Sequence, residues 1–206
     1  MDIHRWKMIV PRKTTKMNIN IENIAQLFKE TYYEPSYKDW RLNKSKAGKD
    51  VIGEHYEAFR NALYTNAGYQ VARKRIATYN PDLLIYKNNQ LVLIEEAKGH
   101  YVDSCFLKRA IGNYAECILH YMDRNETPPR FCLSCPTSMK NYESIRDKYV
   151  RIYEKSIQDC IKENFSYISL CEHGRINKEQ YFTKEESCFK LSDKLIEKQI
   201  RYINGL

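Results

Sequence analysis

Apolar residues recur at helical spacing in two stretches of the first third of the chain. They predict a helix over residues 19–31 and a second over about 51–66, which Ala67-Gly68 ends because glycine is favoured just after a helix. Residues 32–50 between them are polar, and Lys44–Lys49 is expected to form a loop. The later pattern predicts strands at 69–76, 82–86, 91–97, 130–135 and 166–171, and helices at 103–124, 141–163 and 190–203.

The order of these elements predicts an α/β fold. From residue 51 to 171 a helix is followed by three strands, a helix, a strand, a helix and a strand. Helical crossovers imply parallel pairing of the later strands, with right-handed connections. We therefore expect one domain around a central mixed sheet of about five strands flanked by helices. Residues 1–50 would be an N-terminal extension and residues 172–206 a C-terminal helical tail.

Residues 82–97 carry the pattern of a β-hairpin. Two apolar runs, 82–86 and 91–97, flank the polar break Lys87-Asn88-Asn89-Gln90. Alternate residues of a strand share a face, which predicts one face made of Val92, Ile94, Glu96 and Lys98. Asp82 at the start of the first strand would then lie beside Glu96 across the ladder. Glu95 would face away from Glu96, and we interpret it as structural.

Pro81-Asp82 followed by Glu96-Ala97-Lys98, within this order of elements, resembles the PD-(D/E)XK nuclease superfamily. The resemblance covers about residues 51–171 and implies a restriction-endonuclease-like core. Within the superfamily, a compact single-domain chain of this size is most similar to a Type II restriction endonuclease. Residues 53–59 resemble the first helix of the family, which often carries a further acid. Position matches that acid to Glu57, with Glu54 as the competitor.

The resemblance implies a Mg²⁺ site on the hairpin. Asp82 and Glu96 would hold the ion, with the backbone carbonyl of Ala97 as a further ligand, since magnesium prefers oxygen ligands and keeps several waters. Lys98, held among acids, would keep its positive charge and contact the scissile phosphate and the attacking water. Glu57 would bind the metal through water or hold a second ion.

The charge of the chain is compatible with a polyanionic partner. The formal net charge is +8 and the sequence pI is about 9.0, although charge alone does not specify a fold. Basic residues near the motif would supply salt-dependent phosphate contacts, together with the loop Lys44–Lys49. The candidate DNA-binding residues are Arg73, Lys74, His100, Lys108 and Arg109.

The number of cysteines and the length of the apolar runs indicate in which cell compartment the protein is expected. Seven cysteines, an odd number, favour a reduced cytoplasmic protein over a disulfide framework. Cys132 and Cys135 fall three apart on a predicted strand and so point to opposite faces, which argues against zinc. The apolar runs are far shorter than a membrane span.

These features predict a Mg²⁺-dependent, sequence-specific endodeoxyribonuclease that cuts double-stranded DNA as a homodimer, in the manner of a Type II restriction system. Two alternatives remain open. One is a structure-specific DNA repair or recombination nuclease of the same superfamily. The other is a non-catalytic DNA-binding protein that retains the fold, against which the intact set of two acids and a lysine counts.

Overall fold

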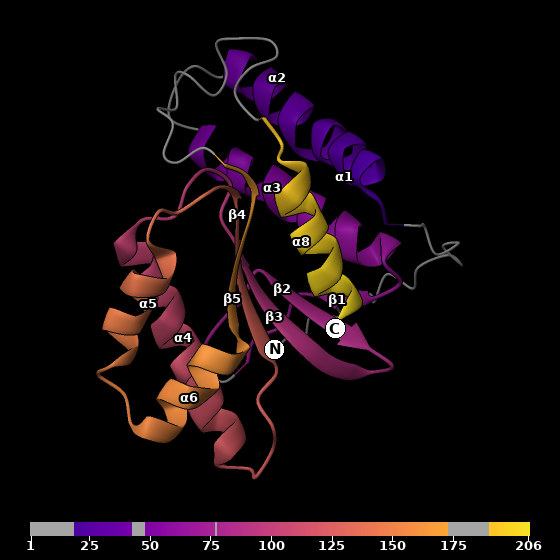
Figure 1. The fold of residues 1–206 in the computed structure, drawn as a ribbon. Helices are drawn as coiled ribbons and strands as arrows, with labels where there is room; N and C mark the ends of the chain where they lie inside the picture. Colours follow the sequence, from indigo (N-terminus) through magenta and orange to yellow (C-terminus); the bar gives the residue numbers. More distant parts are fainter. Residues whose placement is uncertain (1–18, 43–47, 77, 173–189) are drawn as a thin grey trace, which may run out of the picture.

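The computed structural model describes residues 19–42, 48–76, 78–172 and 190–206, which build a five-stranded mixed sheet (Figure 1). Its order follows the chain: β1 (Gln70–Ala72), β2 (Leu83–Lys87), β3 (Gln90–Ala97), β4 (Arg130–Thr137) and β5 (Phe165–Cys171). The first three strands pair antiparallel, whereas β3, β4 and β5 pair parallel. The mixed sheet and the parallel crossovers confirm the prediction.

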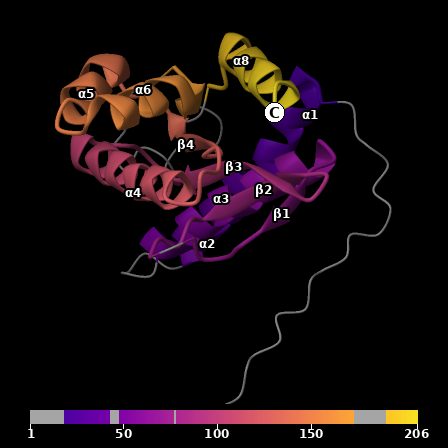
Figure 2. The ribbon, with the colours of Figure 1, turned by 90° about the horizontal axis from the view of Figure 1, so that it is seen from below.

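Helices cover both faces of the sheet, which also confirms the α/β class (Figure 2). One layer contains α1 (Ile21–Phe28), η1 (Lys29–Tyr33, a π-helical turn), α2 (Glu34–Leu42), α3 (Gly48–Asn66) and α8 (Asp193–Asn204). The other contains α4 (Ser104–Met122), α5 (Tyr142–Val150) and α6 (Lys155–Asn164). In the part of the chain described, no helix has both the length and the apolar character needed to cross a bilayer.

Alternation along the central strands supplies a core on each side of the sheet. Leu83, Ile85 and Leu93 are buried with residues of α3 and α8, whereas Leu84 and Ile94 are buried with residues of α4. Both faces are therefore apolar, as expected for a sheet covered on both sides.

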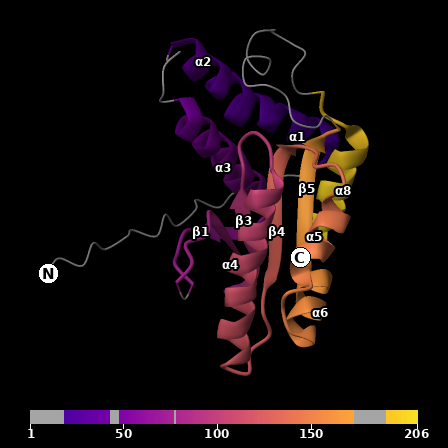
Figure 3. The ribbon, with the colours of Figure 1, turned by 90° about the vertical axis from the view of Figure 1, so that its left-hand side faces the viewer.

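Residues 34–42 form helix α2, which the polar pattern of residues 32–50 did not predict. Figure 3 shows α1, η1 and α2 as one nearly continuous rod. Tyr32 and Ser36 are fully buried, and η1 and α2 both pack on α3, which explains why a polar stretch is helical. Residues 44–47 of the expected loop lie outside the described residues, whereas positions 48 and 49 belong to α3, so the loop prediction is wrong there.

The stretch 141–163 forms two helices, α5 and α6, instead of the single predicted helix. The chain turns after Val150, whose carbonyl accepts a hydrogen bond of 3.1 Å from the Tyr153 N–H. Ile152, which fitted the helical stripe, is 73% exposed. The turn places Ile157 and Ile161 of α6 in the core beside α4.

Two predictions about the strands also need correction. The strand expected over 69–76 is limited to β1, at 70–72. Val92 does not share a face with Ile94, because Leu91 lies opposite Tyr86 and Leu93 opposite Ile85, which leaves Val92 as an extra residue. This bulge turns Val92 toward the core under α3.

Candidate active site

The structure brings Asp82 and Glu96 together at the end of the hairpin. Leu83 lies opposite Glu95, and the next position places Asp82 beside Glu96. Oδ2 of Asp82 accepts a hydrogen bond of 2.8 Å from the Ala97 N–H, which fixes the Asp82 carboxylate against β3. The alternation of residues along the two hairpin strands had predicted that Asp82 lies beside Glu96.

Burial raises the pKa of Glu96 to about 8, and the charge of Asp82 and a hydrogen bond between the two carboxyl groups act in the same direction. Two carboxylates in contact resist simultaneous ionisation, so Glu96 keeps its proton near neutral pH. A bound divalent cation would remove that resistance, because it neutralises both charges. The donor set therefore fits a hard cation.

Tyr79 holds the Glu96 carboxyl group, and no pattern in the sequence pointed to this contact. Its hydroxyl donates a hydrogen bond to Oε1 of Glu96. The Tyr79 side chain is buried against the α4 core, and its backbone forms a bridge to Ile76 with two hydrogen bonds of 2.9 Å. Burial and the charge of Glu96 raise the pKa of Tyr79 far above its usual range, so the hydroxyl remains a donor.

Glu57 of α3 is the third acid near this pair. Burial raises the pKa of Glu57, and the charge of Asp82 raises it further, whereas Arg73 lowers it. Arg73 forms an ion pair with Glu57, so this predicted DNA-binding residue instead contacts a predicted metal ligand. The charge of Glu54 has a smaller effect on the pKa of Glu57.

Across the described residues, no group of three or more His, Cys, Asp or Glu side chains lies close enough to hold a metal ion. A cation at this point would therefore take two carboxylates, from Asp82 and Glu96. Water and a backbone oxygen such as that of Ala97 would complete its shell, which is the usual way in which proteins hold Mg²⁺. Glu57 would act through water.

Lys98 follows β3, and its N–H donates a hydrogen bond of 2.8 Å to the Ser134 carbonyl of β4. Its Nζ lies 4.3 Å from the centroid of the Phe106 ring. We expected this ammonium among the acids, but no ion pair joins it to an acid of the described chain. Arg109 lies one turn after Phe106 in α4, and its Cζ is 4.6 Å from the centroid of the same ring. The charge of Arg109 lowers the pKa of Glu96.

The other predicted DNA-binding residues lie elsewhere. Lys108 is exposed, with its Nζ 5.9 Å from the ring of Tyr149 in α5. His100 is half-buried, and its carbonyl accepts a hydrogen bond of 2.7 Å from Thr137. Lys74 is exposed just after β1. Of the five candidates, Arg109 shares the ring of Phe106 with Lys98, and Arg73 pairs with Glu57.

Gly99 packs the segment after Lys98 against the first helical layer. The hydroxyl of Tyr32 donates a hydrogen bond to the Gly99 carbonyl. A Cβ at this glycine would lie 2.7 Å from the carbonyl oxygen of Ile52 in α3, so no larger residue fits without movement of the backbone. The close contact holds the end of β3, and with it Lys98, in place.

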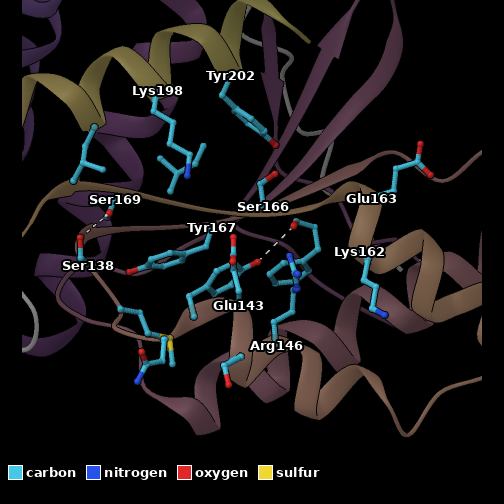
Figure 4. Close-up of a pocket in the computed structure, with 17 residues that line it drawn as sticks. Ser138, Glu143, Arg146, Lys162, Glu163, Ser166, Tyr167, Ser169, Lys198 and Tyr202 are labelled. Carbon is cyan, nitrogen blue, oxygen red and sulfur yellow. Dashed lines mark hydrogen bonds between the residues drawn. The ribbon is translucent and has the colours of Figure 1, made fainter.

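A separate pocket of about 720 Å³ lies along β5, the edge strand at the far side of the sheet from β1. Figure 4 shows that Lys198 and Tyr202 line it from α8, and Glu143 and Arg146 from α5. None of the predicted site residues lines this pocket. Its acidic and basic side chains are mixed, so it is a poor match for a polyanion.

Comparisons of the chain with protein-family models, curated proteins and solved structures find no match. The geometry of Asp82, Glu96 and their neighbours is therefore the main evidence for a function.

Proposed function

We propose that this protein is a Mg²⁺-dependent endodeoxyribonuclease with a restriction-endonuclease-like core, which hydrolyses phosphodiester bonds of double-stranded DNA at a short sequence. The observation that carries the proposal is the contact between Asp82 and Glu96, with Lys98 and Arg109 next to it. Two acids in contact are costly unless they serve a cation or a proton transfer. The positively charged side chains of Lys98 and Arg109 suit a substrate that carries phosphate groups.

Asp82 and Glu96 would hold the ion, which supplies charge neutralisation at the phosphate and a more acidic water when bound. Asp82 is oriented for this by the Ala97 N–H, and Glu96 by the Tyr79 hydroxyl. Both carboxyl groups are thus fixed before substrate arrives, so little reorganisation is needed.

Lys98 would donate to a non-bridging oxygen of the scissile phosphate. Its ammonium is a compact charge on a flexible stem, and no acid of the described chain pairs with it. The attacking water would be oriented between this ammonium and the phosphate. Glu57, whose pKa the charge of Asp82 raises, would assist through a further water.

A homodimer would suit a palindromic site, since two-fold symmetry presents the same half-site to each copy. Light scattering with and without DNA measures this part of the proposal. A complex of two chains per duplex supports it, and a single chain per cut site contradicts it.

Cleavage of complex DNA tests the main proposal. The protein is incubated with genomic DNA and Mg²⁺, and the new ends are sequenced. D82N and K98M remove the charge of a carboxylate and of the lysine, whereas D159N and K155M make the same changes at exposed positions of α6. We expect one short motif at the ends, no ends with D82N or K98M, and normal cleavage with both controls.

The other outcomes are equally informative. Random ends refute sequence specificity, and cleavage only at forks, flaps or junctions would favour a structure-specific nuclease. Binding of DNA without new ends would favour a non-catalytic protein. Normal cleavage by D82N or K98M would refute the assignment of the site.

A further inference from the structure

The ring of Phe106 contacts two cations beside the candidate site. The Nζ of Lys98 lies 4.3 Å from the ring centroid, and the Cζ of Arg109 lies 4.6 Å from it. The face of an aromatic ring attracts cations, guanidinium groups in particular. Lys98 follows β3 and Arg109 belongs to α4, so the ring is the contact that the two charges share.

The position of Phe106 does not depend on these cations. α4 begins after Asp103, whose carboxylate accepts a hydrogen bond of 2.7 Å from the Phe106 N–H. This N-cap fixes the first turn of the helix. The half-buried ring packs against the core on this side of the sheet. The ring is therefore a preformed support to which the flexible side chains attach.

The same contact keeps both charges near the acid pair without neutralising them. In the described chain, neither Lys98 nor Arg109 forms an ion pair with an acid, and Lys98 stands two positions after Glu96, directly after β3. Their charged groups lie no further apart than the sum of their distances to the ring. Two cations that share one ring and have no acid partner in the described chain are available to bind an anion such as a phosphate.

We propose that Phe106 is a positioning residue that holds Lys98 and Arg109 side by side, so that both bind oxygens of the scissile phosphate. This inference rests on the proposed nuclease function and extends it, because Arg109 becomes a second group at that phosphate. A guanidinium group offers a planar pair of donors and an ammonium a point charge, so the two contact different oxygens of one phosphate.

Single-turnover cleavage by F106L and F106Y tests the role of the ring. Leucine keeps apolar bulk but has no aromatic face, whereas tyrosine keeps the face. Y121L makes a similar change at a half-buried position near the other end of α4. We expect F106L to lower the cleavage rate by about 10- to 100-fold, because small misplacements of reacting groups have effects of this size. F106Y and Y121L should cleave normally, with Mg²⁺ dependence unchanged in all three.

Salt dependence of DNA binding gives a second readout, measured in a D82N background so that no cleavage occurs. The slope of log K against log salt is negative, and each lost phosphate contact reduces its magnitude by about one. R109A is expected to show this loss. F106L should show it in part, and F106Y should not.

The inference is overturned if F106L cleaves at the normal rate, if F106Y is as slow as F106L, or if R109A leaves the salt slope unchanged. It is also overturned if F106L is slow only because it unfolds, which melting curves compared with those of Y121L reveal. Absence of cleavage by the unmodified protein would refute the proposed nuclease function itself, which is a distinguishable result.

Discussion

Glu95 and Glu96 are adjacent in β3, yet their surroundings differ in almost every respect. Glu95 faces the α3 side of the sheet and is fully buried, as the alternation of the strand predicted. Glu96 faces the other side, where it is partly exposed and in contact with a second acid. One position in the sequence thus separates a structural carboxylate from a candidate functional one.

The partners of Glu95 are all donors. Arg60 binds Oε1 through Nε at 2.5 Å and Oε2 through Nη2 at 3.0 Å. Ser134 donates to Oε1 at 2.6 Å, and the hydroxyl of Tyr64 donates to Oε2. Gln199 of α8 accepts from Arg60 at 2.6 Å, so the network joins α3, the sheet and the C-terminal helix. A buried charge satisfied in this way serves the fold.

Glu96 has the opposite set of neighbours. Among the described residues, the hydroxyl of Tyr79 donates to it, and Asp82 adds a like charge. The nearby cations Lys98 and Arg109 lie against Phe106 and do not pair with it. Acids with raised pKa values beside other acids are common at functional sites, which is the basis of the proposed role of Glu96.

The largest effect on stability should follow from E95A. It leaves the Arg60 charge buried without its partner, and breaking a buried pair in this way costs about 3–5 kcal/mol. Urea denaturation measures the loss, with E96A as the matched change on the other face. A loss below about 1 kcal/mol for E95A, the range of exposed pairs, would refute its structural role.

G99A should have the next largest effect. The new Cβ would lie 2.7 Å from the Ile52 carbonyl oxygen, and forced overpacking costs about 1–3 kcal/mol. The matched control is G53A in α3, where a Cβ meets nothing within 4 Å. That change should stabilise the helix by about 0.5–1 kcal/mol. Equal melting temperatures for G99A and G53A would show that the contact at Gly99 is not tight.

The ionisation of Glu96 should make stability depend on pH. Its pKa rises from an ordinary 4.5 to about 8 in the folded protein, so between these values the folded state holds a proton that the unfolded state has lost. Stability therefore falls as pH rises through this window in buffer without divalent cations. E96Q should flatten the melting temperature against pH, leaving a smaller slope from Glu57, whose pKa is also raised. Identical slopes for E96Q and the unmodified protein would contradict the pairing with Asp82.

The smallest effect is expected from R73A. The Arg73 side chain is 64% exposed, and its ion pair with Glu57 should contribute at most about 1 kcal/mol. Urea denaturation checks this value. A larger loss would mean that Arg73 stabilises the fold through contacts in addition to its ion pair with Glu57.

The sequence predicted the parts of the site that depend on short-range rules. Strand alternation was enough to separate Glu95 from Glu96, and the hairpin was enough to bring Asp82 beside Glu96. The same alternation put Cys132 and Cys135 on opposite faces, and they lie in the two different cores.

Contacts between distant elements were not predictable in this way. The ring of Phe106 meets Lys98 only because α4 begins where the Asp103 cap places it. Arg60 meets Gln199 across 139 positions of the chain. Arg73 was predicted from its charge alone, and charge does not reveal that an acid such as Glu57 pairs with it.

Joint binding of one divalent cation by Asp82 and Glu96 is measured most directly by calorimetric titration of Mg²⁺ at neutral pH, in two buffers that differ in ionisation enthalpy. We expect one binding event that releases a proton, because Glu96 holds one near neutral pH before the cation binds. E96Q should lose the event, and D159N should keep it. Binding by E96Q equal to that of the unmodified protein, or binding without proton release, would contradict the account.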